Sequence, residues 1–94
     1  MRHTTLSQLE VFDAIVRHGS FTRAAEELFL TQPKVSMQLR KLTDAVGLPL
    51  FKQIGEQPYR TGAGRSLYKF SCEIFERFSC FEMTIADIRM FEAG

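Results

Sequence analysis

This 94-residue sequence has few of the features that mark membrane, secreted or disulfide-rich proteins. It contains no tryptophan, two histidines, two cysteines and three prolines. No run approaches the roughly 20 apolar residues that a membrane-spanning helix needs. The first ten residues become polar and helical too early for a secretory signal peptide. We therefore expect a cytoplasmic protein with no membrane contact.

Groups that would support catalysis or metal binding are also lacking. The sequence shows no glycine-rich phosphate loop and no cluster of nucleophile, base and orienting group. His3 and His18 have no cysteine or carboxylate at the spacing of metal ligands. We expect no enzyme activity, no metal and no cofactor in this chain.

The two cysteines, Cys72 and Cys80, are eight residues apart. On one helix this spacing corresponds to about 12 Å at a rise of 1.5 Å per residue. That distance excludes a disulfide between them within the chain. The simplest interpretation is two small apolar residues on a packed helix, with a redox role as the alternative.

The net charge of +1 conceals an uneven distribution of charge. Residues 31–65 carry six basic and two acidic side chains, a net charge of +4, whereas residues 66–94 carry three basic and five acidic ones, a net charge of −2. A basic middle segment is where a phosphate backbone would be bound.

The segment from Thr31 to Gly47 has the pattern of a helix with one buried face. Its apolar stripe contains Val35, Leu39, Leu42 and Val46. Thr31 can cap the start, and Gly47 can end the helix in the left-handed conformation. The opposite face is basic and able to form hydrogen bonds, and it carries Pro33, Lys34, Ser36, Met37, Arg40 and Lys41. Such a helix can lie in a DNA major groove.

Two helices are predicted before it, over residues 5–18 and 21–29. The first starts at a capping-box pattern of Thr5 with Gln8, and it has an apolar stripe of Leu6, Leu9, Phe12, Ile15 and Val16. In the second, Ser20 can act as the cap, and Ala24 and Ala25 allow close packing of helices. A short helix, a tight turn and an exposed helix together form a helix-turn-helix arrangement.

Residues 48–61 change character and predict a two-stranded wing. Pro49 and Pro58 disfavour helix, and Gly55 with Glu56 reads as the tip of a turn. The flanking segments 50–54 and 58–60 are strand candidates. A wing after a helix-turn-helix typically contacts DNA beside the minor groove.

Residues 62–91 predict one long helix, capped by Thr61 and about 45 Å in length. Apolar residues recur every seven positions in two interleaved sets, and the stripe predicts a dimer interface with a second copy. The alternative, folding back onto the first helix, is expected only for the first turns. The predicted interface comprises Leu67, Phe70, Ser71, Ile74, Phe78, Phe81, Ile85 and Ile88.

These observations predict a mainly α fold with two parts. Residues 1–61 form a winged helix-turn-helix head with three helices and a two-stranded wing. Residues 62–94 form a linker and dimerisation helix.

The segment LSQLEVFDAIVRHGSFTRAAEELFLTQPKVSMQLRKLTDAVGLPLF, followed more weakly by TGAG, resembles the N-terminal domain of LysR-type transcriptional regulators. The resemblance implies a winged helix-turn-helix whose linker helices pair antiparallel in a homodimer, with a homotetramer in a full-length protein. It also implies DNA contacts from the start of the third helix and, on phosphates, from the start of the second. By motif position these are Gln32, Pro33, Lys34, Ser36 and Met37, and Ser20, Thr22 and Arg23.

The sequence departs from the family pattern at two positions that bear on DNA contact. Lys34 stands where the family usually has a small residue, and Gln53 stands where the wing commonly has an arginine. Lys52 or Arg60 can take over the wing contact. Thr31 and Arg40 complete the predicted DNA-binding set.

The resemblance extends to function. Members of the family are about three times longer and carry a C-terminal domain that binds a small effector, which is therefore expected only in a full-length protein. The segment VSMQLRKL resembles the subgroup that controls carbon-fixation operons. Operator sequence, effector identity and the direction of regulation do not follow from the sequence.

Individual side chains suggest specific base contacts, and some of them have a simpler alternative. Gln32 can read adenine, Lys34 or Arg40 can bind guanine or phosphate, and Met37 can touch a thymine methyl group. Arg40 and Lys41 can instead form a merely solvated face, and Met37 can be a plain exposed methionine. For the whole chain, the alternative function is a helical adaptor that binds another protein through the phenylalanine-rich long helix.

Overall fold

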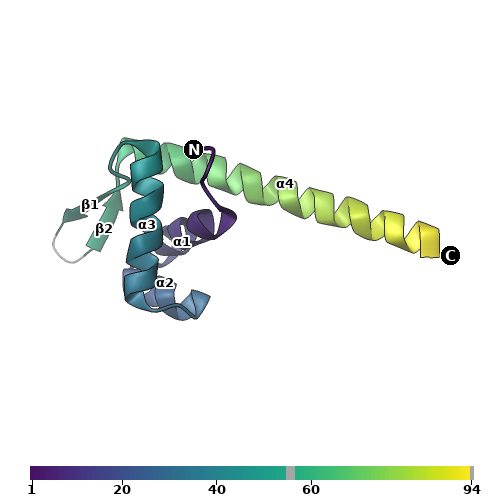
Figure 1. The fold of residues 1–94 in the computed structure, drawn as a ribbon, viewed down its shortest axis with the longest axis horizontal. Coiled ribbons are helices and arrows are strands. Elements are labelled where there is room, and N and C mark those ends of the chain that lie inside the picture. The colour runs from purple at the N-terminus through teal and green to yellow at the C-terminus, as the bar shows by residue number, and fades with distance from the viewer. Residues whose placement is uncertain (55–56, 94) are drawn as a thin grey trace.

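A computed structural model describes residues 1–54 and 57–93. Three helices form a head, a two-stranded wing lies beside it, and one long helix projects away (Figure 1). The long axis of the molecule measures 57 Å, against 25 and 20 Å for the other two. The mainly α winged helix-turn-helix fold is confirmed. Its elements are α1 (Leu6–His18), α2 (Phe21–Leu28), α3 (Gln32–Val46), β1 (Phe51–Ile54), β2 (Gln57–Arg60) and α4 (Gly62–Ala93).

Each helix begins at a side-chain cap that the sequence predicted. The hydroxyls of Thr5, Ser20, Thr31 and Thr61 accept hydrogen bonds from backbone N–H groups three residues later, at 3.1–3.3 Å. These bonds satisfy N–H groups that have no partner within the helix. The caps therefore set where the helices start, including the start of α3.

The head is built around two adjoining apolar clusters. The first joins α1, α2 and α3 through Val11, Ala14, Ile15, Ala24, Ala25 and Val35. The second contains Leu9, Phe12, Leu42 and Leu50, with Leu39 and Val46 packed against it. The predicted α3 stripe is therefore confirmed. Leu6 was wrongly predicted to be buried: it is exposed in the first turn of α1 and belongs to neither cluster.

The wing is a single antiparallel pair in which Phe51 lies opposite Arg60. Phe51 anchors it to the head, because its ring lies 5.4 Å from the Phe12 ring and 6.2 Å from the Phe21 ring. The predicted turn at residues 55 and 56 lies outside the described residues. Packing of Phe51 against two helices fixes the base of the wing beside α3.

Thr61 and Gly64 tie the wing to the start of α4. The Thr61 hydroxyl donates to the Pro49 carbonyl at 2.6 Å, and the Thr61 N–H donates to the Leu50 carbonyl at 3.1 Å. Gly64 is buried, and a Cβ atom at this position would overlap the Leu50 carbonyl oxygen. Only glycine allows this close approach of α4 to the chain that enters the wing.

The first turns of α4 pack on the head, and the remainder leaves it. Leu67, Tyr68 and Phe75 pack against the second cluster, and Ser71 is fully buried. The prediction for Ser71 is therefore wrong, because its own head covers it and it cannot contact a partner. Leu67 is half-buried against the head, as expected for the first turns of the helix, and its contact with a second copy stays a prediction. Cys72 and Cys80 are exposed free thiols, so their predicted packing is also wrong.

Candidate nucleic-acid interface

The outward face of α3 brings six of the predicted DNA-contacting residues together. Val35 and Leu42 are fully buried and fix the rotation of the helix about its axis. The opposite side chains are consequently directed to solvent. Those exposed on α3 are Gln32, Pro33, Lys34, Ser36, Met37 and Arg40. Thr31 is exposed as well, although its hydroxyl caps the helix by accepting from the Lys34 N–H.

The start of α2 supplies a second group of exposed polar residues. Thr22 and Arg23 are exposed, and Ser20 is half-buried at the cap. The Ser20 hydroxyl accepts from the Arg23 N–H at 3.2 Å. A helix N-terminus with an adjacent arginine has the polarity and hydrogen-bond donors that suit a phosphate group.

The wing offers Lys52 and Arg60, both exposed. The Arg60 guanidinium also lies over the Tyr68 ring of α4, 5.1 Å from its centroid. In addition, the Arg60 carbonyl accepts a hydrogen bond from Nη1 of Arg65 at 3.1 Å. Arg60 is therefore held at the junction with α4, whereas the exposed Lys52 shows no such contact among the described residues.

A cluster of charged side chains braces α2 against α1, and sequence reasoning missed it. Arg17 donates to Asp13 at 2.8 Å and to both carboxylate oxygens of Glu27, while His18 lies 3.0 Å from Glu27. The hydrogen bonds from Arg17 and His18 lower the pKa of Glu27 to about 2. This cluster joins the end of α1 to the last turn of α2, beside the apolar contact between the two helices.

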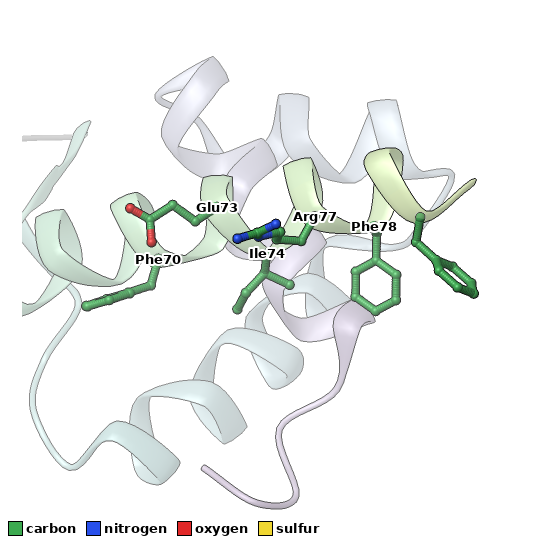
Figure 2. Close-up of a pocket in the computed structure, with 6 residues that line it drawn as sticks. Phe70, Glu73, Ile74, Arg77 and Phe78 are labelled. Carbon is green, nitrogen blue, oxygen red and sulfur yellow. The ribbon is translucent and has the colours of Figure 1, made fainter. Parts of the chain in front are cut away.

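The phenylalanine-rich stripe of α4 is exposed along most of its length. A shallow groove of about 450 Å³ lies on this face and is lined by Phe70, Glu73, Ile74, Arg77, Phe78 and Phe81. Figure 2 shows Phe70, Ile74 and Phe78 projecting on one side of the helix. Of the predicted interface, Phe70, Ile74, Phe78, Phe81 and Ile88 are exposed, and Ile85 is half-buried.

The described residues offer little for other kinds of site. Within residues 1–54 and 57–93, no group of three histidine, cysteine, aspartate or glutamate side chains is placed to hold a metal ion. Over the same part of the chain, no helix combines the length and the apolar character needed to cross a membrane.

Comparison with known proteins places this geometry in context. Residues 6–65 match the family described as "Bacterial regulatory helix-turn-helix protein, lysR family". Over all 94 residues, the chain is 49% identical to a RuBisCO operon transcriptional regulator of Acidithiobacillus ferrooxidans. It is equally similar, over the same length, to the HTH-type transcriptional activator CmpR of a Synechocystis strain. The chain spans 30% and 31% of the length of these two relatives.

A solved structure matches the fold and includes DNA. The complex of the BenM DNA-binding domain with benA site 1 DNA superposes with a TM-score of 0.84 at 26% identity, covering 89% of this chain and 94% of that one. The family match covers more than half of the chain and includes α1, α2, α3 and the wing. This chain therefore belongs to the lysR family of bacterial regulatory helix-turn-helix proteins and is a DNA-binding domain of that family.

Proposed function

We propose that the chain recognises a specific duplex sequence by placing α3 in the major groove. The observation that carries this proposal is the exposed polar face of α3, held outward by fully buried Val35 and Leu42. Phosphate contacts come from the start of α2 and from the wing, which flank that helix. The likeness to a domain solved on DNA supports this arrangement.

Within that arrangement, individual side chains take different roles. Gln32 reads adenine, Lys34 and Arg40 bind guanine or phosphate, and Met37 contacts a thymine methyl group. Ser20, Thr22 and Arg23 bind phosphate and carry no sequence information. Lys52 supplies the main wing contact, because Arg60 is engaged with Tyr68.

The protein acts as a homodimer through α4. Five large apolar side chains of the predicted interface are exposed in one stripe on this helix, which is unusual for a surface that stays in water. In a full-length protein we propose a homotetramer, a small-molecule effector bound by a further domain, and a location in the cytoplasm.

The regulated genes are those of carbon fixation. This proposal rests on 49% identity to a RuBisCO operon regulator over the whole chain. The equally similar relative CmpR is named as a transcriptional activator, which favours activation as the direction of regulation. Neither relative carries a name that indicates catalysis, which agrees with a protein that is not an enzyme.

The test is a titration of labelled duplex DNA from the promoter region next to the gene, at several salt concentrations. We assume that each protomer neutralises about four phosphates, each of which contributes roughly −0.9 to the slope. For the dimer, a plot of the logarithm of the binding constant against the logarithm of the salt concentration should then have a slope near −7. A slope near zero would remove the electrostatic basis of the proposal. A helical adaptor that binds only proteins should not shift the DNA at any of these concentrations.

Two variants distinguish base reading from phosphate contact. Gln32→Ala should cost about 1–3 kcal/mol on the specific site and much less on random DNA. Arg23→Ala should weaken binding to both by similar factors, because phosphates are the same in every sequence. If Gln32→Ala loses equal binding free energy on the two DNAs, the Gln32 side chain contacts the DNA backbone and does not read a base.

A further inference from the structure

The two strands of the wing are attached to the rest of the molecule in different ways. β1 begins at Phe51, which packs against both apolar clusters of the head. β2 ends at Arg60, which lies opposite Phe51 in the hairpin and is exposed. Figure 1 shows the strands projecting beyond α3, with their base beside the start of α4. The tilt of the hairpin therefore depends on what holds Arg60.

Arg60 is held on α4 through both its side chain and its backbone. Its guanidinium lies 5.1 Å from the centroid of the Tyr68 ring, within the range of a cation–π interaction. Its carbonyl accepts a hydrogen bond from Nη1 of Arg65 at 3.1 Å. Neither arginine forms an ion pair within the described part of the chain, so no carboxylate there competes with the ring for the Arg60 guanidinium.

The ring that receives Arg60 is itself fixed by the core of the head. Tyr68 is half-buried and packs against the second cluster. Its ring lies 6.5 Å from the ring of Phe12, which is fully buried and also contacts Phe51. The base of the wing and the first turns of α4 are therefore positioned by the same buried ring. A guanidinium placed on Tyr68 is consequently fixed relative to the whole head.

The pairing of the strands separates an attached face of the hairpin from an outer face. Residues directly opposite each other in an antiparallel pair project on the same face, and successive residues alternate between faces. Phe51 and Arg60 therefore share the face that is turned to the head, and Lys52 and Tyr59 share the other face. Both residues of the outer pair are exposed. Lys52 can thus meet a phosphate while Arg60 stays on α4.

We propose that Tyr68 is a positioning residue for DNA binding, whose ring holds Arg60 on α4 and so sets the tilt at which the wing brings Lys52 to a DNA phosphate. This inference rests on the proposed function, in which Lys52 supplies the main wing contact. Arg60 has the same positioning role from the wing side and does not itself bind DNA. Without the ring, the hairpin pivots about Phe51, and Lys52 spends less time at the phosphate.

The test measures the salt dependence of DNA binding, because each neutralised phosphate contributes roughly −0.9 to the slope. Lys52→Ala removes one contact from each protomer of the proposed dimer, so the slope should change from about −7 to about −5. Tyr68→Leu keeps an apolar side chain against the core but offers no ring to Arg60, and it should give the same slope. The double variant should also stay at about −5, whereas two independent contacts would give about −4.

Two further variants are matched controls. Tyr68→Phe keeps the ring and should give the native slope. Phe75 is also half-buried on α4 against the second cluster, but it makes no cation–π contact among the described residues. Phe75→Leu should therefore lower the thermal unfolding midpoint and leave the slope at about −7. A loss of stability alone would thus be separated from a loss of wing position.

Arg60→Gln tests the same contact at an exposed position, where the variant is expected to fold. It should give a slope of about −5, both alone and together with Lys52→Ala. Circular dichroism should show the native helical content for both variants.

Several results would overturn the inference. A native slope for Tyr68→Leu would show that the wing keeps its position without the ring, and a steeper slope would show that the released Arg60 binds DNA. Additive losses in the double variant would show that Tyr68 and Lys52 act independently. A native slope for Lys52→Ala would remove the wing contact, and the inference with it. If the native chain does not bind DNA, or binds it with a slope near zero, the proposed function fails instead, so the two failures are distinguishable.

Discussion

The head and the distal part of α4 use the same kinds of residue to opposite effect. In the head, Phe12 and Leu42 are fully buried by elements of their own chain. On α4, Phe78 and Phe81 are exposed by 46% and 61%, because no other described element of the chain reaches them. Apolar content therefore does not separate a core from an interface. What separates them is whether the chain can return to cover the residue.

The same contrast applies to the origin of specificity. In the head, buried residues orient α3 so that its polar face meets a ligand. On α4, the apolar face is itself the proposed contact, and the polar residues beside it, Glu73 and Arg77, are available to select a partner. Substitutions in the two regions and at their junction test this division, in order of decreasing effect.

The largest effect is expected for Phe78→Glu, which should separate the proposed dimer and leave the head folded. Two carboxylates would enter a desolvated seam, at a cost of several kcal/mol per dimer, which raises the dissociation constant at least about a hundredfold. Light scattering should show a monomer whose circular dichroism keeps its helical signal. DNA affinity should fall toward that for one half-site.

The counterpart in the head is Phe12→Ala, for which we expect a loss of about 3–5 kcal/mol in the free energy of unfolding. If Phe78→Glu remains dimeric, the stripe on α4 serves another contact. If it unfolds like Phe12→Ala, the distal helix belongs to the core of the domain, and the division between head and tail is wrong.

Gly64→Ala should have an intermediate effect, because it acts where the two regions join. The added methyl group overlaps the Leu50 carbonyl oxygen, so α4 and the chain entering the wing must move apart. We expect a loss of about 1–3 kcal/mol in the free energy of unfolding, measured by thermal or urea denaturation. Gly62→Ala is the matched control, since a Cβ atom there meets no atom within 4 Å. Equal unfolding midpoints for the two variants would show that the junction is not tightly packed.

The sequence predicted the features that depend on local spacing. Caps at Thr5, Ser20, Thr31 and Thr61 were correct because a hydroxyl three residues before an N–H needs no distant partner. The buried face of α3 was correct because the helical period fixes it. The predicted DNA-contacting residues are exposed, but which of them touch DNA stays a prediction.

The errors occur where tertiary packing decides. Ser71 fits the sevenfold pattern of α4, but the junction at Gly64 places that turn of the helix against the head. Leu6 fits the stripe of α1, but no element covers its first turn. The ion pair between Arg17 and Glu27 depends on the angle between α1 and α2, which no local pattern specifies.

The smallest effect is expected for Glu27→Gln, which tests the charged brace between α1 and α2. The pKa of Glu27 lies at about 2, below its ordinary value of 4.5, because Arg17 and His18 donate hydrogen bonds to the carboxylate. A carboxyl group with a lowered pKa stabilises the fold above pH 4.5, and this contribution is lost as the pH falls toward 2. The native chain should therefore unfold at a slightly higher temperature than Glu27→Gln near pH 6, and the difference should vanish on acidification.

Glu26→Gln is the control for general acid effects, because Glu26 is a neighbouring exposed carboxylate without an ion pair among the described residues. A difference that persists at low pH would show that Glu27 acts through its shape rather than its charge. Because the brace lies in the head, the proposed dimer through α4 should be the same for the native chain and the variant at every pH tested.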